Sequence, residues 1–355
     1  MWVGSEVGVS LSALWPLVLG TVLVVSPVAV GAQPAIVRVR VVEEATNEPL
    51  PNAEIMDRVS GTRRFTNAAG EALFPRDTRS IALRVRQLGF RYVDGTIGVG
   101  VDSATFALKR VAYILPPVHT TTTTTCSPGT DSTAATLSAA VLEQLRAGAE
   151  RYEAFRREYP FRVRLERLSG NITPDSDVKP TRASMETEHS DRWGERYAPN
   201  RIVAHTPRGF SVPILFISAL ADSVFWDRHC FSARGVESLG GTRVIRLHFA
   251  PNGSVRTPDW EGAALVDSAS SMLRRVEFRL TGLKAGDRPR RLEGYTTFTS
   301  PTPFIVVPDT TTAIWWRRDA PEDGDWGNAD AVQRIALKEI AFLRSIPPGF
   351  RRQDP

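Results

Sequence analysis

The sequence has only two cysteines in 355 residues, Cys126 and Cys230. This low count excludes a small domain held by many disulfides and a multi-cysteine zinc or iron–sulfur centre. Lysine is also scarce, since only four of the 44 basic residues are lysine. The arginines are interleaved with acidic residues and form no basic tail, so the formal charge of +5 does not indicate a nucleic-acid partner. The length predicts about two domains, and the 23% charged residues and 8% aromatic residues exclude a largely disordered chain.

Motifs of the common hydrolases are absent from the sequence. A metallocarboxypeptidase needs a histidine with a glutamate three residues later, and no histidine of this chain has that neighbour. The segment 209–213 lacks the second glycine of a serine-hydrolase elbow. Residues 95–100 are rich in glycine but lie between predicted strands, so they predict a turn and not a phosphate-binding loop. We therefore predict no catalytic residue, no metal and no cofactor.

One long apolar run, Leu11–Val30, stands near the N-terminus. Small residues occupy the positions that a signal peptidase reads, and polar sequence begins at Gln33. Residues 1–32 are therefore predicted to be a secretory signal peptide that is cleaved between Ala32 and Gln33. The alternative is an uncleaved inner-membrane anchor, since about 20 apolar residues span a bilayer. No second run of that length follows. The sequence thus predicts an exported protein that is periplasmic or outer-membrane associated, and peripheral to the membrane at most.

The segment 33–115 shows the alternation of half-buried β-strands. Residues 36–41 place three valines on one face and two arginines on the other, and residues 81–86 repeat the pattern. A shorter strand is predicted at 106–108. Turn-forming residues separate these segments, at 46–48, 67–70 and 94–95. Strands at this spacing predict an antiparallel β-sandwich of about 80 residues.

Three motifs in this segment resemble the carboxypeptidase regulatory-like domain. Residues 46–55, TNEPLPNAEI, resemble the family's opening motif T-G-x-P-L-x-G-A-x-V. Residues 66–72, TNAAGEA, resemble its T-D-x-x-G-x-F turn, and residues 83–90, LRVRQLGF, resemble its L-x-V-x-x-x-G-Y strand. The resemblance implies a transthyretin-like Greek-key sandwich. The family's module is non-catalytic and is attached to secreted peptidases, outer-membrane receptors and other envelope proteins, so it implies no activity here.

Three asparagines mark departures from the family pattern. Asn47 and Asn52 stand where the family prefers glycine, and asparagine is the residue next most tolerant of a left-handed backbone. Asn67 replaces the usual aspartate, which keeps an Asx turn available.

Residues 116–133 begin with two prolines and include the six threonines Thr120–Thr125, a composition that predicts an extended linker. Residues 134–159 then predict one long amphipathic helix that stops before Pro160, because apolar residues recur every three or four positions. We expect its apolar stripe to pack on the sheet of its own domain. The stripe consists of Leu137, Val141, Leu145, Ala149, Tyr152 and Phe155.

Residues 134–355 are predicted to form a second, β-rich domain. Its predicted strands are 161–166, 202–205, 245–249, 263–267, 275–280, 292–299, 304–307 and 312–316. The segment 333–346 fits a strand and a helix equally. These features predict a strongly curved antiparallel sheet with the long helix against it, and a chain that is mainly β. Three segments are similar to the companion region that follows the module in certain secreted bacterial proteins, which implies no activity: 227–231, 245–251 and 273–278.

The two cysteines predict one disulfide, Cys126–Cys230, because the chain is predicted to be exported. A free structural thiol is one alternative. Another is catalysis by Cys230 with His229 as its base, but neighbours on a strand point to opposite faces, which disfavours this pair.

One aromatic and basic cluster stands out, Trp315-Trp316-Arg317-Arg318. On a strand one tryptophan points inward and the other outward, which predicts core packing for one and a surface position for the other. The alternative is a contact with a glycan, a lipid or a peptide.

These patterns favour a non-enzymatic envelope protein that binds or scaffolds a partner, which would be an envelope protein, a peptide, a glycan or a lipid. A second hypothesis is a carrier of a hydrophobic ligand, because a curved sheet with a helix on its concave side can enclose an apolar cavity. The third hypothesis is a thiol-dependent enzyme.

Overall fold

A computed structural model describes most of the chain after residue 35. The described residues are 36–75, 78–111, 132–172, 178–194, 197–206, 209–212, 215, 217–284, 289–302, 305–316 and 331–346. The predicted signal peptide 1–32, its cleavage site at Ala32 and Gln33, and nearly all of the predicted linker 116–133 lie outside this part of the chain. No helix among the described residues has the length and hydropathy needed to cross a membrane.

The first β domain consists of seven strands in two small sheets. The strands are β1 (Ile36–Glu43), β2 (Glu54–Asp57), β3 (Arg63–Phe65), β4 (Glu71–Pro75), β5 (Ile81–Arg86), β6 (Val93–Ile97) and β7 (Ser103–Leu108). One sheet has the order β4-β1-β7 and the other the order β3-β2-β5-β6. The alternating apolar residues of β1 and β5 are fully buried between the sheets, including Val39, Val41, Leu83 and Val85. The predicted sandwich is therefore present.

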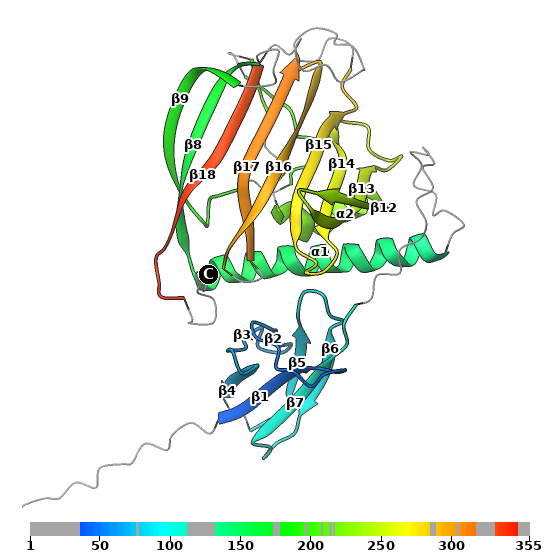
Figure 1. Cartoon of the computed structure of the whole chain (residues 1–355), viewed down its shortest axis with the longest axis vertical. Helices are drawn as coiled ribbons and strands as arrows, with labels where there is room; N and C mark the ends of the chain where they lie inside the picture. Colours follow the sequence, from blue (N-terminus) through cyan, green and yellow to red (C-terminus); the bar gives the residue numbers. More distant parts are fainter. Residues whose placement is uncertain are drawn as a thin grey trace, which may run out of the picture. The chain divides into compact units, whose positions relative to one another are not determined.

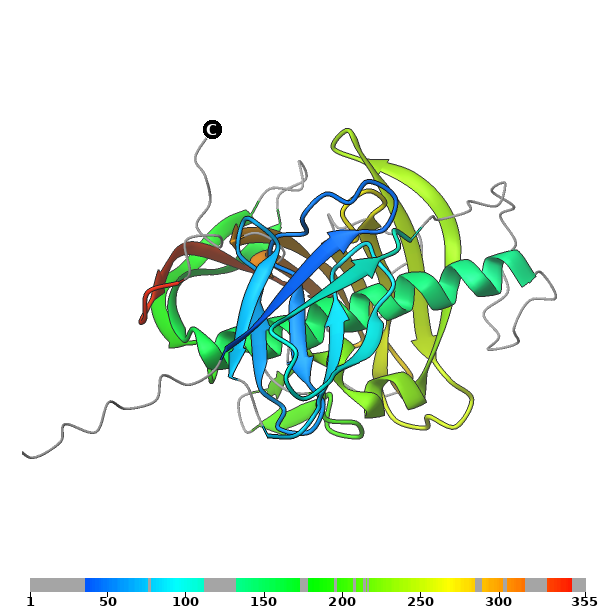
Figure 2. The same cartoon turned by 90° about the horizontal axis from the view of Figure 1, so that it is seen from below.

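One pair of strands in the sandwich departs from the prediction. β1 and β7 run parallel (Figure 2), so the prediction of a wholly antiparallel sandwich is wrong for this pair. The prediction assumed that neighbouring strands are joined by short turns. A parallel pair needs a long crossover instead, and here strands β2–β6 form that crossover.

The asparagine positions of the sandwich have the backbone geometry that the sequence predicted. Asn47 and Asn52 have φ angles of 56° and 61°, which is the left-handed region. The Oδ1 atom of Asn67 accepts hydrogen bonds from the backbone N–H groups of Ala69 and Glu71, each at 3.0 Å. The predicted Asx turn is therefore formed.

The turn predicted at residues 94–95 is wrong, because both residues lie within β6. Glycine is required at position 95 because a side chain would not fit there, and not because the backbone turns. A Cβ atom at this position would lie 2.5 Å from a ring carbon of Phe106, which packs across the sandwich core. The turn of the glycine-rich segment is confined to residues 98–102.

The second β domain follows the long helix α1 (Ser132–Glu158). Its strands are β8 (Phe161–Ile172), β9 (Val178–His189), β10 (Ala204–Thr206), β11 (Gly209–Ser211), β12 (His229–Leu239), β13 (Thr242–Pro251), β14 (Asp259–Asp267), β15 (Leu273–Thr281), β16 (Arg291–Thr302), β17 (Ile305–Trp316) and β18 (Ala331–Phe342). Two short helices precede β12, η1 (Ile217–Ala221) and α2 (Ser223–Arg228). Nine strands form one sheet in the order β12-β13-β14-β15-β16-β17-β18-β8-β9, and β10 and β11 form a separate hairpin.

Every neighbouring pair in the nine-stranded sheet is antiparallel. The sheet curves, and α1 lies across its concave side in contact with β12, β13 and β17 (Figure 1). The predicted fold class, mainly β with a curved antiparallel sheet and one long helix, is therefore confirmed.

Several predicted strand boundaries change. The segments 304–307 and 312–316 belong to one continuous strand, β17, because Pro308 sits where the register with β16 shifts and needs no ladder hydrogen bond there. In the ambiguous segment 333–346, residues 333–342 belong to the strand β18, which pairs with β17 and β8, and residues 343–346 lie outside any strand or helix. The strand predicted at 202–205 is reduced to the short β10.

Helix α1 packs against both β domains. Its apolar stripe lies in the core of the second domain, as predicted. Its other side contacts the sandwich, which the sequence did not indicate. The Gln144 carboxamide accepts a hydrogen bond from the Gly89 N–H at 2.8 Å and donates one to the Phe90 carbonyl at 3.2 Å. Arg86 of the sandwich forms an ion pair with Glu150 at 2.6 Å.

Buried charges reinforce this contact. Arg151 is buried and donates hydrogen bonds to the Asn52 carbonyl and, at 3.1 Å, to the Gln87 side chain. Glu54 is also fully buried and pairs with Arg63 and with Arg86, the latter at 2.8 Å. Burial by itself would raise the pKa of Glu54, but the neighbouring arginines outweigh it and lower this pKa. Burial lowers the pKa of Arg151 to about 10, so both groups are charged at neutral pH.

Candidate functional site

The concave face of the nine-stranded sheet is lined by apolar side chains. Successive side chains of a strand point to opposite faces, so alternate residues of β13 and β15 reach the same core. On β15 these are Val276, Phe278 and Leu280, all buried. Across the sheet, β13, β14, β16, β17 and β8 contribute to the same cluster. The opposite face of β13 and β15 carries charged residues instead, such as Arg246 and Glu277, which pair at 2.8 Å.

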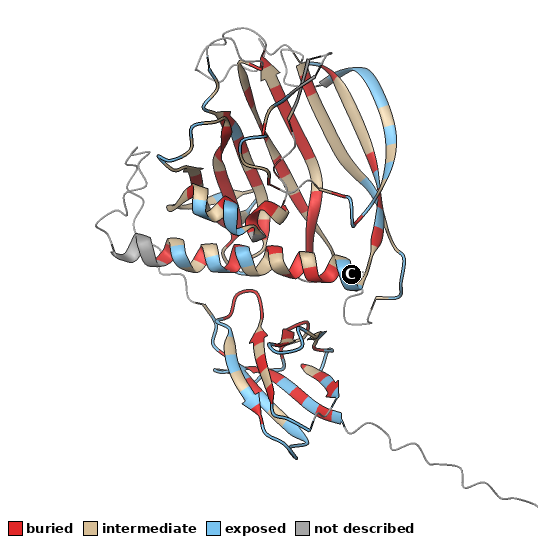
Figure 3. Ribbon diagram, turned by 180° about the vertical axis from the view of Figure 1, so that it is seen from behind, coloured by how far each residue is buried: buried red, intermediate tan, exposed pale blue. Residues whose placement is uncertain are grey.

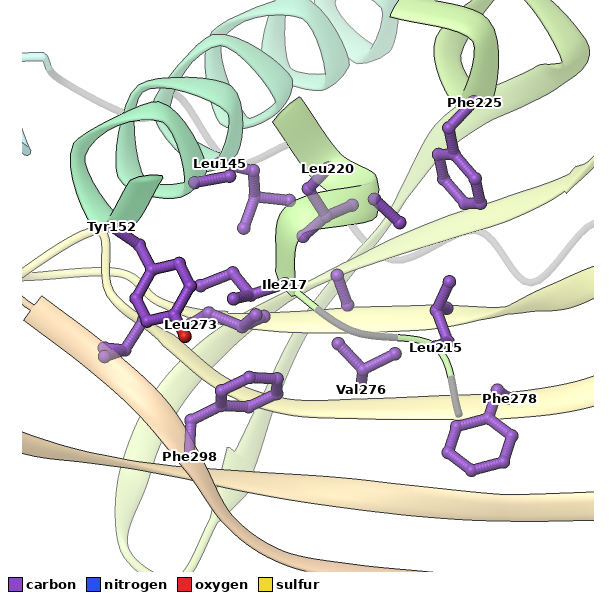
Figure 4. Close-up of a cluster of buried hydrophobic side chains, with 14 of the residues drawn as sticks. Leu145, Tyr152, Leu215, Ile217, Leu220, Phe225, Leu273, Val276, Phe278 and Phe298 are labelled. Atoms are coloured by element: carbon purple, nitrogen blue, oxygen red, sulfur yellow. The ribbon is translucent and has the colours of Figure 1, made fainter. Parts of the chain in front are cut away.

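Helix α1 and helix η1 supply the other wall of this core. Leu145 and Tyr152 of α1 and Ile217 and Leu220 of η1 point toward Leu273, Val276 and Phe298 of the sheet (Figure 4). The stripe on α1 faces the sheet because its apolar residues recur at helical spacing.

A small apolar pocket opens between these walls. Its cavity volume is about 10 Å³, room for about one water molecule, so the surrounding side chains fill most of the space. Gly148 lies on the α1 side of the pocket, where an added Cβ atom would lie 3.8 Å from a methyl carbon of Leu88. The pocket is lined by Leu88, Gln144, Leu145, Gly148, Ile217, Leu220, Ser271, Met272, Leu273 and Val306.

The main polar group of the pocket wall is already engaged in hydrogen bonds. Both ends of the Gln144 carboxamide bind the backbone of the sandwich, at Gly89 and Phe90. The carboxamide oxygen and nitrogen are therefore already bonded and do not attract a polar ligand. The remaining wall is mostly hydrocarbon. The wall is chemically suited to an apolar group such as an alkyl chain, for which the side chains around the cavity would have to move apart.

The apolar lining continues beyond the pocket onto β18 and β8. Ile335, Leu337 and Ile340 pack against the core cluster but are only half-buried. Leu165 on β8 stands opposite Leu337 and is buried. Strands β18 and β8 therefore leave apolar surface partly exposed to solvent. A longer apolar ligand would make further contacts there.

A buried polar cluster lies where β12 begins. The two ring nitrogens of His229 lie 2.8 Å and 3.0 Å from the backbone carbonyl oxygens of Phe225 and Trp260. Tyr197 donates a hydrogen bond to Asp259 at 2.5 Å. Burial lowers the pKa of His229, whereas burial and the bond to Asp259 raise the pKa of Tyr197. Since both ring nitrogens are engaged and the ring stacks on Phe225, His229 is not placed to act as a base.

The structure describes only part of the predicted disulfide and thiol site. Cys230 follows His229 on β12, is half-buried and carries no free thiol. Cys126 lies outside the described residues, so the pair Cys126–Cys230 stays a prediction. In the described part of the chain, no group of three or more His, Cys, Asp or Glu side chains is arranged to hold a metal ion.

The aromatic cluster divides between the two faces of β17 as predicted, but the predicted surface position of one tryptophan is wrong, because both side chains are covered by neighbouring residues. Trp315 packs against the concave core, and Trp316 is buried on the opposite face with the Arg291 guanidinium 4.7 Å from its ring centroid. Arg317 and Arg318 lie outside the described residues. A ligand contact by this cluster stays a prediction.

Sequence reasoning identified Leu145 as part of the apolar stripe but missed Gly148 and Leu88. Gly148 was one unremarked position in a helical pattern, and Leu88 belonged to a different predicted domain. The only sequence signal was a glycine in the middle of a long helix, which is unfavourable unless packing requires it.

Comparisons with known proteins add a weak likeness of structure. No protein-family model and no curated protein matches the sequence. A DUF1329 family protein from Desulfovibrio piger is 9% identical with a TM-score of 0.31, and the match covers 60% of this chain and 97% of that one. A domain described as an outer membrane lipoprotein-sorting protein, from Vibrio parahaemolyticus, is 12% identical (TM-score 0.28; 58% and 95% covered). A LolA superfamily protein from Nitrosomonas europaea is 13% identical (TM-score 0.29; 57% and 94% covered). These values assign neither a family nor a function.

Proposed function

We propose that this protein is a non-catalytic carrier that holds the apolar part of a ligand, such as an acyl chain, on the concave side of its nine-stranded sheet. The observation that supports the proposal is the apolar lining between α1, η1 and β15, with its polar wall group already hydrogen-bonded. The half-buried apolar row on β18 extends this lining. Burying each methylene group of a ligand there stabilises the complex by about 0.8 kcal/mol.

The proposal is tested by filling the pocket from its two walls. Gly148→Leu adds an isobutyl group on α1, and its Cβ meets only Leu88 at an ordinary contact distance of 3.8 Å. Met272→Phe fills the pocket from the half-buried opposite wall. Ala139→Leu is the control, since it places a leucine side chain at an exposed position of the same helix.

The assay is displacement of a fluorescent fatty-acid probe by unlabelled fatty acid. Keeping two or three methylenes of the ligand from passing between these walls removes about 2 kcal/mol, so both filling variants should bind the probe more than tenfold more weakly. Ala139→Leu should bind it like the unmodified chain. Equal affinity in all four proteins would refute the proposed site, and no binding by the unmodified chain would refute the proposed carrier.

We also propose that the sandwich is a carboxypeptidase regulatory-like module and that the chain acts in the cell envelope. The left-handed Asn47 and Asn52 support the first point, because they occupy positions where the family prefers glycine. The apolar run before Gln33 supports the second. A mature N-terminus at Gln33, measured on protein recovered from the envelope fraction, is the expected result, and an intact Met1 in the cytosol would contradict it.

A further inference from the structure

The nine-stranded sheet has two edge strands, β12 and β9, at its opposite ends (Figure 1). An edge strand presents N–H and C=O groups that can pair with a strand of another chain, and proteins usually protect such edges with a bulge or a covering element. The two edges of this sheet differ in this protection.

The β12 edge is protected by a bulge and by α1. The bulge between Ala233 and Val236 interrupts the pairing with β13, and Gly235 within it has a φ angle of 113°. The Ala233 N–H donates a hydrogen bond to the Ser138 hydroxyl of α1 at 2.8 Å, so the helix occupies a donor of this strand. A further strand cannot continue the ladder along β12 without displacing both features.

The middle of β9 has no such cover among the described residues. The Ser190 N–H donates to the Phe161 carbonyl at 2.8 Å, and hydrogen-bonded pairs alternate along an antiparallel ladder. Even-numbered residues of β9 therefore bond to β8, and the N–H and C=O groups of Ala183, Met185 and Thr187 point outward. No described residue bonds to these backbone groups. All three residues are exposed, and this edge is drawn partly in pale blue in Figure 3.

The regular stretch of β9 is symmetric about Met185. Thr181 is a bulge that is left out of the pairing with β8, and the strand ends at His189. The regular stretch between them runs from Arg182 to Glu188, with Met185 at its centre and 47% exposed. A second copy of β9, antiparallel and centred on Met185, can therefore pair along the whole stretch.

The charges of β9 fit such a second copy. In pairing about Met185, Arg182 of one copy stands opposite Glu188 of the other, and the two-fold symmetry repeats this at both ends. Both are non-hydrogen-bonded positions, where the side chains of opposite residues come closest. Neither side chain forms an ion pair with another described residue, whereas Glu186 is already paired with Arg167 of its own chain at 3.1 Å.

The neighbouring registers fit less well. Outward-facing residues must oppose one another, so the centre of symmetry moves by one residue at a time. A centre at Glu186 sets that carboxylate opposite itself, which is unfavourable. A centre at Ser184 sets Glu188 opposite Pro180, beyond the bulge of β9. The pattern of β9 is thus complementary to itself in one register, which favours a second copy of this chain over an unrelated strand.

We propose that two copies of this chain associate through β9, antiparallel about Met185, so that the sheet of one copy continues into the other. The outward-facing residues then supply about six backbone hydrogen bonds between the copies. One pair of strands covers less than the roughly 800 Å² per partner of a standard stable interface. The dimer is therefore reversible and forms at micromolar or higher concentration.

The experiment is sedimentation velocity of the chain beginning at Gln33, from about 1 µM to about 200 µM. Met185→Pro removes the central N–H donor, and an edge strand tolerates proline where the N–H faces solvent. Met185→Thr is the matched control, because it changes the same side chain and keeps the N–H. The variants Arg182→Glu and Glu188→Arg each set like charges opposite one another, and the double variant Arg182→Glu/Glu188→Arg restores unlike charges.

The unmodified chain and Met185→Thr should dimerise to a similar extent, and Met185→Pro should stay monomeric. Each single charge variant should dimerise about tenfold more weakly, and the double variant should recover the dimer. The charge variants decide the outcome if Met185→Pro does not fold, as judged by circular dichroism.

A monomer at every concentration would overturn the proposal and would leave a strand of another protein as the partner of this edge. A dimer that persists in Met185→Pro would also overturn it, and so would a dimer that the double charge variant does not restore. Fatty-acid probe binding should be the same in Met185→Pro as in the unmodified chain, so this proposal and the carrier proposal fail separately.

Discussion

The substitution Glu54→Gln tests the buried charges of the sandwich, beside which Arg151 of α1 is also buried. The Glu54 side chain is 1% exposed and pairs with Arg63 and Arg86. Removing its charge leaves these arginines, and the buried Arg151 nearby, without their shared carboxylate. Breaking a buried pair in this way typically costs about 3–5 kcal/mol. Arg86 keeps Glu150 as a partner, and Arg63 is 29% exposed and can turn to water, so we expect the lower end, about 3 kcal/mol.

Thermal unfolding followed by circular dichroism is the assay. At roughly 2 °C per kcal/mol for a chain of this size, Glu54→Gln should lower Tm by about 6 °C. Glu44→Gln is the control, because Glu44 is an exposed residue on the same domain, and its Tm should stay within about 1 °C of the unmodified chain. If the two variants unfold at the same temperature, the buried charges around Glu54 do not stabilise the fold.

Two further predictions concern thiols and pH. The mature protein, unfolded without reductant, should show no reactive thiol and two after reduction, because Cys230 is not free; two thiols before reduction would contradict the predicted bridge. Hydrogen bonds from His248 and Arg279 lower the pKa of Glu261 to about 2, below its ordinary value of 4.5. The stabilisation that results from this lowered pKa is present above pH 4.5 and is lost as the pH falls toward 2. Glu261→Gln should therefore lower the free energy of unfolding at pH 7 but much less at pH 2.5, as measured by urea unfolding. A difference that does not change with pH would contradict this.

The sequence was sufficient for elements whose signal is local. The alternation in residues 36–41 and 245–249 identified β1 and β13, because one face of each is buried and the other is not. Asn47 and Asn52 marked left-handed turns for the same local reason. The strand β9 gave no such signal, because its residues on both faces are polar or partly exposed. The edge strand β12 was missed as well, because a bulge between Ala233 and Val236 interrupts its pattern.

Contacts between distant segments had no local signal. Arg151 and Gln144 look like residues of a solvated helix face, yet their partners Asn52 and Phe90 come from the sandwich, 99 and 54 residues earlier. The same holds for the pocket, because the position of Gly148 is explained only by its contact with Leu88 of the sandwich. The sequence could therefore predict the two β domains and the apolar stripe of α1. It could not predict the contact between α1 and the sandwich, or the pocket beside that contact.

The most direct test of the carrier proposal is native mass spectrometry of the mature chain purified from the envelope without added lipid. The proposal predicts an extra mass equal to one lipid or acyl ligand, which is lost on organic extraction and reduced in Gly148→Leu but not in Ala139→Leu. A single ligand-free mass for the unmodified chain, together with no binding of added fatty acid, would contradict it.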